Sequence, residues 1–416
     1  MKCIQFKSIL MKRSSLYFTF GLILQIFLFT YVNGCLVSAN SVQELNKHWP
    51  TNEWKHMTPE EHDLNPKYFN QITEVIENRT YPLSSLVIVN NMGYVLYEWH
   101  MMFYDENKTY ETFSVTKGII GLLIGIAIDK GFIENVDVPI SRYFNSSEWK
   151  NPSPRKEAIT IRHLLTFTTG FEYDELSTSY GDPNNLFNIW KASSDWVQFT
   201  LDLPMNADPG QQFTFCAPAS HLLSVILYKA TGQTPLEFGN QFLFKPIGVN
   251  IDLWKTEPNE IHNDGGNGLY MSTQDMARVG YLMYNNGTWN GTQIISKEWI
   301  KEVTKPHFHT FYGYQWWLLP EEEFGKGAVW ATGTFETRAL VILREYGLIL
   351  SIVSTYPEGE TAEWPRKLIT DYLIPATLPY NPDSSDQSMN SFNVLFILPS
   401  LFTLIYLEKR RKNFTD

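Results

Sequence analysis

Residues 114–130 read SVTKGIIGLLIGIAIDK, and this stretch decides the fold because it predicts a buried helix that begins at a serine. In a helix, Ser114 and Lys117 lie one turn apart on the same face. The apolar residues that follow would bury the Lys117 ammonium, which lowers the pKa of a lysine and favours the neutral amine. The pattern therefore predicts a nucleophile, Ser114, beside a base, Lys117. Taken alone, it also fits a serine that caps a helix and a lysine that points into water.

Strand-like segments lie on both sides of this helix in the sequence. Residues 84–90 and 94–99 are rich in β-branched and aromatic residues, and the turn between them predicts a β-hairpin. Residues 339–343 and 347–353 repeat this pattern near the other end. The order predicts an α/β (α+β) fold, in which one sheet is closed by N- and C-terminal segments around a helical insert. Helices are expected in the insert at 160–166, 219–231 and 269–285.

The composition is that of a globular, acidic protein. The chain has 416 residues, of which 44% are hydrophobic, and a formal net charge of -11 at pH 7. Its body has no basic stripe, which argues against nucleic acid as a partner. Cys3, Cys35 and Cys216 show no C-x-x-C spacing, so we expect neither a zinc site nor a disulfide framework, and no cofactor.

Both ends of the chain carry apolar runs with basic flanks. Residues 1–39 have the order of a secretory signal peptide: lysines, then an uncharged run, then a small-residue site that ends at Ala39. Residues 392–407 are almost wholly apolar and precede a basic cluster, which predicts a transmembrane helix. An uncleaved anchor at the first run and, because Pro399 interrupts the second, an amphipathic segment there are the alternatives.

The basic flanks also predict an orientation in the membrane. Lys and Arg lie on the outer sides of both apolar runs, so the positive-inside rule places the termini in the cytoplasm and the body outside it. We therefore expect a single-pass protein of the secretory pathway and cell membrane. Five Asn-x-Ser/Thr triplets of the body would be glycan acceptors in that compartment, at Asn78, Asn107, Asn145, Asn286 and Asn290.

Five segments carry recognisable motifs, at residues 114–117, 161–170, 209–215, 268–278 and 330–334. In this order they resemble the serine β-lactamase and penicillin-binding-protein superfamily, in particular its class C-like branch of esterases and D-aminopeptidases. Ser114-Val115-Thr116-Lys117 is similar to the first motif of that superfamily, and residues 161–170 are similar to its "HLLTHTSG" stretch. Residues 209–215 resemble the approach to its second motif, and residues 268–278 its "GGLxSTxxDMAR" block. Trp330-Ala331-Thr332-Gly333-Thr334 stands where the superfamily carries K-T-G or H-x-G.

The resemblance implies a fold and a set of site residues. It implies an antiparallel sheet flanked by helices with an inserted, mainly helical subdomain, and an acyl-enzyme on Ser114 with Lys117 as the base. The backbone N–H groups of Ser114 and Thr334 would form the oxyanion hole. We expect the substrate to be bound by Phe215, Tyr173, Trp316 and Gly333.

Two positions depart from the pattern of the superfamily. Its second motif begins with a tyrosine whose hydroxyl relays protons, whereas the matching triplet here is Phe215-Cys216-Ala217. Ala331 stands where relatives carry a Lys or His that holds a substrate carboxylate. Tyr173 and Tyr180 are candidates to supply a hydroxyl from another direction.

These observations predict a membrane-anchored serine hydrolase that acts outside the cytoplasm on an ester, an amide or a peptide. Esterase-like activity on a small, uncharged substrate is favoured over hydrolysis of a carboxylate-bearing β-lactam. The alternative is a catalytically impaired pseudoenzyme or binding module, because Phe215 replaces the tyrosine. The expected parts are a signal peptide at 1–39, an N-terminal extension at 40–82, a hydrolase domain at 83–380, a polar linker at 381–391, a transmembrane helix at 392–407 and a basic cytoplasmic tail at 408–416.

Overall fold

A computed structural model describes residues 47–80, 82–333, 336–354 and 364–380. The predicted signal peptide, linker, transmembrane helix and tail lie outside the described residues, and so does Thr334. Within the part of the chain that is described, no helix is both long enough and apolar enough to span a membrane.

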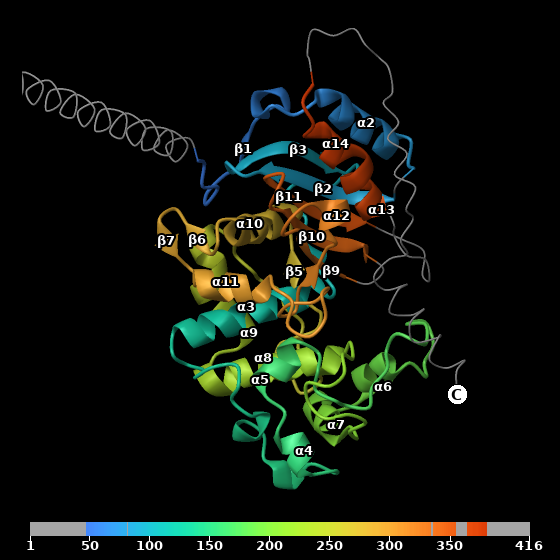
Figure 1. Ribbon diagram of the computed structural model, residues 1–416, viewed down its shortest axis with the longest axis vertical. Coiled ribbons are helices and arrows are strands. Elements are labelled where there is room, and N and C mark those ends of the chain that lie inside the picture. The colour runs from blue at the N-terminus through green and yellow to red at the C-terminus, as the bar shows by residue number, and fades with distance from the viewer. Residues whose placement is uncertain (1–46, 81, 334–335, 355–363, 381–416) are drawn as a thin grey trace, which may run out of the picture. The chain divides into compact units, whose positions relative to one another are not determined.

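The chain divides into two compact units, Met1–His48 and Trp49–Asp416, and a sheet organises the second. Among the described residues this sheet has seven strands, in the order β1-β3-β2-β11-β10-β9-β8 (Figure 1). Neighbouring strands are antiparallel except β1 and β3, which are parallel. The strands are β1 (Lys55–His56), β2 (Leu83–Asn90), β3 (Tyr94–His100), β8 (Trp317–Leu318), β9 (Val329–Thr332), β10 (Arg338–Leu343) and β11 (Leu348–Ser354). Two short pairs stand apart from it, β4 (Tyr110–Glu111) with β5 (Tyr270–Met271) and β6 (Thr288–Trp289) with β7 (Thr292–Gln293).

The predicted hairpin between β2 and β3 forms because its turn residues suit a tight turn. The Asn90 side-chain oxygen accepts hydrogen bonds from the backbone N–H groups of Met92 and Tyr94, both at 3.0 Å. Gly93 adopts a φ of 85°, which glycine reaches without strain. The whole of β2 is buried, and it pairs with β11, so N- and C-terminal segments meet inside the sheet.

Helices cover both faces of the sheet (Figure 1). On one face α10 (Thr273–Tyr284) packs against β10 and β11, and Gly280 allows its close approach to Leu340 and Ile349. On the other face α2 (Pro66–Glu77) packs on β3 through Phe69 and Tyr97. The C-terminal helical pieces α13 (Trp364–Lys367), η7 (Leu368–Leu373) and α14 (Ile374–Ala376) lie beside α2.

The remaining helices build the insert. Helix α3 (Val115–Asp129) lies between the sheet and this insert, since it contacts β9 and β10 as well as α8. The α-helices of the insert are α4 (Pro154–Glu157), α5 (Ile161–Leu165), α6 (Leu186–Ala192), α7 (Trp196–Asp202), α8 (Ala217–Thr231) and α9 (Pro235–Gly239), and α11 (Lys297–Val303) and α12 (Glu321–Phe324) follow α10. The shorter turns are η1 (Glu60–His62), η2 (Ile140–Arg142), η3 (Ser146–Glu148), η4 (Asn240–Phe244) and η5 (Lys245–Ile247).

Helix α3 is buried on every side, and three glycines make this packing possible. A Cβ on Gly118 would lie 2.9 Å from Trp316, and one on Gly125 would lie 2.1 Å from Trp299. A Cβ on Gly121 would lie 3.0 Å from the Tyr314 carbonyl oxygen. Aromatic side chains therefore pack directly on the helix backbone at Gly118 and Gly125, and the backbone of Tyr314 does so at Gly121.

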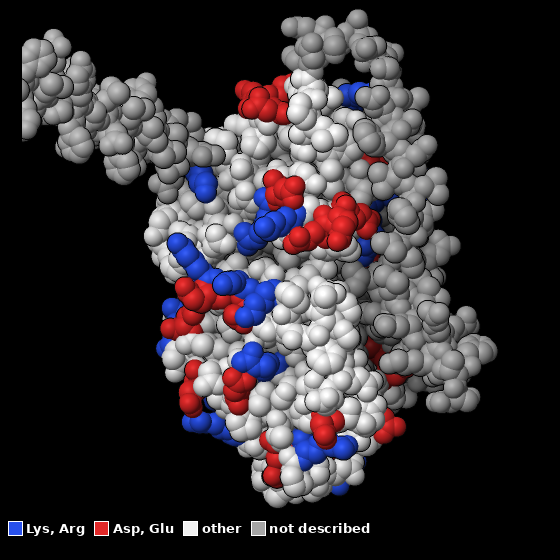
Figure 2. Space-filling model, in the orientation of Figure 1, with Lys and Arg blue, Asp and Glu red and all other residues white. Residues whose placement is uncertain are grey.

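The predicted fold class is confirmed, because helices flank a mainly antiparallel sheet and form an insert. The helix expected at 269–285 starts later than predicted. Tyr270–Met271 pairs with β4 instead, and Ser272 caps α10 by accepting a hydrogen bond from the Asp275 N–H. Figure 2 shows acidic and basic side chains intermixed over one face.

Candidate active site

Ser114 and Lys117 meet at the first turn of α3. Lys117 Nζ donates a hydrogen bond to Ser114 Oγ at 2.7 Å, which confirms the predicted contact. Ser114 is the N-cap of the helix and is partly exposed. Phe113, just before it, has a left-handed φ of 47°, which is strained backbone for a bulky residue. Strain of this kind is found preferentially at functional sites.

The Lys117 side chain is held in a dry environment. It is 2% exposed, and its Nζ also donates to the backbone oxygen of Gly266 at 2.9 Å. Burial lowers the pKa of Lys117 to about 8, although the carboxylates of Glu175 and Asp264 oppose this by favouring the ammonium. Lys117 can therefore lose its proton near neutral pH while it stays bonded to the serine hydroxyl.

The loop that supplies Gly266 is fixed by Asp264. The Asp264 carboxylate accepts hydrogen bonds from the N–H groups of Gly266 at 2.9 Å and Asn267 at 3.1 Å. It also forms an ion pair with Lys191 at 2.6 Å. Burial alone would raise the pKa of Asp264, but Lys191, His221 and the hydrogen bonds to the carboxylate together lower it. Asp264 is thus an anion that shapes the backbone around Lys117.

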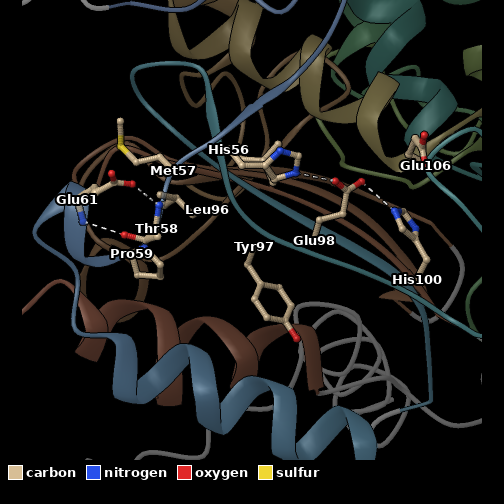
Figure 3. A pocket seen from close by; sticks show the side chains of 11 residues that line it. His56, Met57, Thr58, Pro59, Glu61, Leu96, Tyr97, Glu98, His100 and Glu106 are labelled. Atoms are coloured by element: carbon tan, nitrogen blue, oxygen red, sulfur yellow. Dashed lines mark hydrogen bonds and ion pairs between the residues drawn. The ribbon is translucent and has the colours of Figure 1, made fainter.

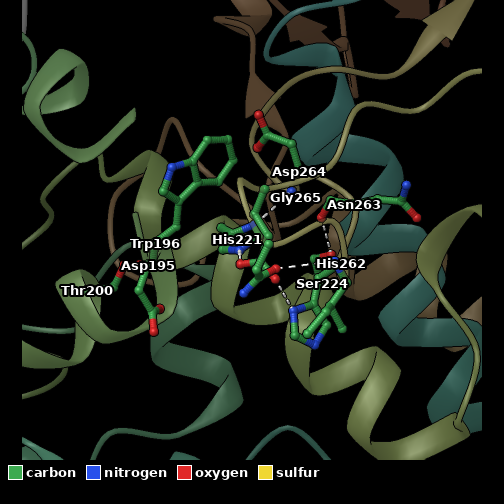
Figure 4. A network of polar contacts seen from close by, with 12 residues as sticks. Asp195, Trp196, Thr200, His221, Ser224, His262, Asn263, Asp264 and Gly265 are labelled. Carbon is green, nitrogen blue, oxygen red and sulfur yellow. Dashed lines mark hydrogen bonds and ion pairs between the residues drawn. The ribbon is translucent and has the colours of Figure 1, made fainter. Parts of the chain in front are cut away.

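A buried polar network supports the same loop from behind (Figure 4). His221 Nδ1 accepts a hydrogen bond from the Gly265 N–H at 3.4 Å, so its Nε2 proton points to Glu257 at 3.0 Å. His262 bonds the other oxygen of Glu257. Burial alone would raise the pKa of Glu257, but the hydrogen bonds from the two histidines lower it to about 2. This network is structural, because it bonds the backbone of the loop and does not reach Ser114.

Glu175 places a second carboxylate near Lys117, in the segment between α5 and α6. It is 1% exposed, and it accepts hydrogen bonds from the Ala217 N–H at 2.9 Å and the Tyr180 hydroxyl at 2.9 Å. Burial raises the pKa of Glu175 against the opposing effect of the Lys117 ammonium. Tyr173 also faces Glu175, and burial raises the pKa of its hydroxyl well above the ordinary value.

Phe215 fills the place where the resemblance implies a tyrosine. Its ring centroid lies 5.3 Å from Lys117 Nζ. At this position the ammonium therefore meets an aromatic ring, where the resemblance implies a tyrosine hydroxyl. Phe215 also stacks on Trp317 at 5.9 Å and meets Phe167 edge-on at 5.0 Å. The lysine therefore adjoins an aromatic cluster.

Of the other expected site residues, Gly333 lies near Ser114 and Trp316 does not face the site. Gly333 lies next to the serine segment, because a Cβ on it would be 2.9 Å from the Cβ of Phe113. Thr334 follows it directly but lies outside the described residues. Trp316 is fully buried behind α3, where its Nε1 donates to the Gly118 carbonyl at 3.2 Å. That position withholds Trp316 from a bound substrate, and it is its neighbour Trp317 that stacks on Phe215.

Sequence reasoning missed four residues of this arrangement: Glu175, Lys191, Asp264 and Gly266. Asp264 stands before two glycines, and a loop of that kind is a signal for backbone held close to a site. Glu175 and Lys191 carry no comparable signal, since charged residues in a loop and on a short helix are ordinary surface residues in a sequence. Their burial is set by how the insert folds back on α3.

A separate cavity lies around β1 and β3, at the edge of the sheet away from β9 (Figure 3). It has a volume of about 610 Å³. Glu98 is its central charged group and bonds His100 at 2.8 Å and His56 at 3.3 Å. None of the site residues described above lines this cavity.

Known proteins share this architecture and sequence pattern. The family profile described as Beta-lactamase matches residues 72–371. The 6-aminohexanoate-dimer hydrolase of Paenarthrobacter ureafaciens is 22% identical over 298 residues, which cover 65% of this chain and 72% of that protein. Esterase EstB of Burkholderia gladioli is 23% identical over 154 residues, covering 35% of this chain and 38% of the esterase.

A solved structure agrees with these sequence relatives. A Bacillus anthracis protein provisionally named a 6-aminohexanoate-dimer hydrolase superposes with a TM-score of 0.64 at 18% identity. The match covers 80% of this chain and 89% of that one. At this identity the likeness shows a shared fold.

Proposed function

The chain belongs to the β-lactamase family, and on that premise we propose that it is a serine hydrolase that forms an acyl-enzyme on Ser114. The named relatives are hydrolases, so a hydrolytic reaction is the starting point. The observation that carries the proposal is the 2.7 Å hydrogen bond between a buried Lys117 and the Ser114 hydroxyl. A serine alone is a weak nucleophile, and this contact supplies it with a base.

The reaction follows from this pair. Lys117, as the neutral amine, takes the Ser114 proton while the serine oxygen attacks the substrate carbonyl carbon. The carbonyl oxygen becomes an oxyanion, which N–H groups at the start of α3 and at Thr334 would stabilise. The Lys117 ammonium returns its proton to the leaving alcohol or amine as the bond to carbon breaks. Water then attacks the acyl carbon and gives a proton to the same amine. As the bond from the acyl carbon to Ser114 Oγ breaks, the Lys117 ammonium returns this proton to Oγ and the carboxylic acid is released.

We assign a small ester or an uncharged amide as the substrate. Phe215 lies beside Lys117 and stacks on Trp317, with the buried Phe167 behind it, and these apolar surroundings favour an apolar acyl group. Ala331 provides no cation for a substrate carboxylate. By their names, one relative hydrolyses a 6-aminohexanoate dimer and the other an ester.

We place this activity outside the cytoplasm, anchored by residues 392–407. The support is the predicted signal peptide and the basic flanks of the two apolar runs. The five asparagines of the Asn-x-Ser/Thr triplets are all exposed, as glycan acceptors must be: Asn78, Asn107, Asn145, Asn286 and Asn290.

The experiment that tests the hydrolase is the steady-state hydrolysis of p-nitrophenyl esters by the wild type, Ser114→Ala and Lys117→Met. Both variants should lose all turnover above the uncatalysed rate, with an unchanged circular dichroism spectrum. Turnover that persists in Ser114→Ala would place the nucleophile elsewhere.

A second candidate is a binding protein that retains the fold without turnover. Phe215 favours it, because the ring occupies the position of a relay hydroxyl whose loss typically costs a rate factor of about 10²–10⁴. In that case the wild type and Ser114→Ala would have equal, background rates of ester hydrolysis.

A further inference from the structure

Two buried carboxylates, Asp264 and Glu175, favour the Lys117 ammonium, and they differ in how their charge is balanced. Asp264 has a cation of its own, since Lys191 pairs with it at 2.6 Å. Glu175 is 1% exposed, and the hydrogen bonds to its carboxylate come from neutral groups, the Ala217 N–H and the Tyr180 hydroxyl. Among the described residues, the cation that faces Glu175 is therefore Lys117.

A short path of contacts links the Glu175 carboxylate to Lys117 Nζ. Glu175 Oε2 accepts from the Ala217 N–H at 2.9 Å. Ala217 in turn packs on Gly266, because a Cβ on Gly266 would lie 3.4 Å from the Ala217 carbonyl oxygen. Gly266 accepts the hydrogen bond from Lys117 Nζ at 2.9 Å. Helix α8 begins at Ala217, so Glu175 is tied to a rigid element beside the lysine.

We infer that Glu175 is a positioning residue of the Ser114–Lys117 pair, and that its carboxylate is the counter-charge which sets how readily Lys117 holds its proton. This inference rests on the proposed function. No relay tyrosine stands at position 215, and Glu175 differs from Asp264 in that Lys191 pairs with Asp264.

The physical reason is that the Lys117 amine and the Glu175 carboxylate compete for the same proton. An ammonium with a carboxylate and a neutral amine with a carboxylic acid contain the same number of protons. Burial disfavours both charges, and accordingly it lowers the pKa of Lys117 and raises that of Glu175. Burial thus favours the neutral amine that the reaction needs, and the Glu175 carboxylate opposes it by favouring the ammonium.

The other groups around the pair keep a fixed charge in this range. Asp264 is held as an anion by Lys191, as described above. The Cys216 thiol stays protonated, because burial raises its pKa well above the ordinary value. Burial also raises the pKa of the Tyr173 and Tyr180 hydroxyls well above theirs. A substitution at Glu175 thus changes one charge near Lys117, while the charges of the neighbouring groups stay the same.

The test is a titration of Lys117 by NMR in protein that contains isotope-labelled lysine, with Lys117→Met to identify the resonance. Glu175→Gln removes the charge and keeps the shape, because its amide oxygen can accept from Ala217 and its NH₂ can donate to the Tyr180 oxygen. The carboxylate favours the ammonium, so the titration midpoint should move to lower pH by about one unit in this variant. The pH dependence of Ser114 labelling by a fluorophosphonate should shift in the same direction.

Glu172→Gln is the matched control, since it makes the same change at an exposed position of the same segment and should leave the midpoint in place. An unshifted midpoint in Glu175→Gln would overturn the inference. Should that variant fail to fold, Tyr180→Phe replaces it, because loss of a donor to the carboxylate also favours the neutral acid and moves the midpoint down. A shifted midpoint without Ser114 labelling would contradict the proposed hydrolase and leave the role of Glu175 standing.

Discussion

Lys117 makes the chemistry of the site depend on pH. The neutral amine is the form that accepts the serine proton, and the pKa of this lysine is lowered to about 8 by burial. Below this pKa the ammonium dominates, and at pH 7 only about 10% of the amine is neutral. Ester hydrolysis should therefore rise with pH and level off above pH 8. A pH profile of kcat/KM tests this, and a rate that falls as pH rises through this range would contradict it.

Phe215 is one of the two positions that depart from the motifs this chain resembles, and restoring a tyrosine tests what that departure costs. Phe215→Tyr would bring a hydroxyl close to Lys117 Nζ, which lies 5.3 Å from the ring centroid. Hydrolysis of an activated ester should rise by about tenfold or more, given what one acid–base group contributes. Steady-state rates measure the change.

Phe213→Tyr is the control for this prediction, because it makes the same change two residues away among Phe311, Tyr312 and Trp317. Its rate should equal that of the wild type. If Phe215→Tyr also leaves the rate unchanged and Tyr173→Phe reduces it, the Tyr173 hydroxyl already serves as the relay. Equal gains in the two tyrosine variants would show that the hydroxyl acts through general polarity and not through Lys117.

At the scale of elements, α3 depends on its glycines. Gly→Ala at a helix interior usually stabilises by about 1 kcal/mol through propensity. In Gly125→Ala, however, the new Cβ would lie 2.1 Å from the Trp299 indole, and overpacking of this kind costs about 1–3 kcal/mol. We expect a net loss in the free energy of unfolding, measured by urea denaturation.

Gly121→Ala provides a graded comparison on the same face of α3. The nearest atom to its Cβ is the Tyr314 carbonyl oxygen at 3.0 Å, so its destabilisation should be smaller. Greater stability of Gly125→Ala than of the wild type would mean that Trp299 does not fix this helix.

The elements that sequence could predict are those whose signal is local. The β2–β3 hairpin follows from Asn90 and Gly93, and α3 follows from an apolar run that begins at a serine. The start of α10 could not be placed, because pairing of Tyr270–Met271 with β4 is a long-range contact. Glu175 could not be found for the same reason, since its burial depends on how a polar loop folds against α8.

At the scale of the whole molecule, the folded body should be separable from the C-terminal segment. The last described helix, α14, is joined to the body by the hydrogen bond from the Asn65 N–H to the Ala376 oxygen at 2.9 Å. A chain that ends at Pro382 keeps this contact and the complete sheet. After expression with its signal, it should be recovered as a soluble, folded protein with a single thermal transition.

The full-length chain is the comparison for this truncation, and we expect it in the membrane fraction. Aggregation of the truncated chain would indicate that the removed residues are needed by the fold. Its retention in the membrane would instead indicate that the N-terminal apolar run is an uncleaved anchor.

The central claim is that Ser114, activated by Lys117, forms a covalent acyl-enzyme. Intact mass spectrometry of the protein after exposure to a fluorophosphonate or an activated ester, with peptide mapping of the adduct, tests it most directly. The account predicts one adduct per chain, on Ser114, which is absent from Ser114→Ala and strongly reduced in Lys117→Met. An adduct on another residue, or the same amount of adduct in Ser114→Ala, would contradict it.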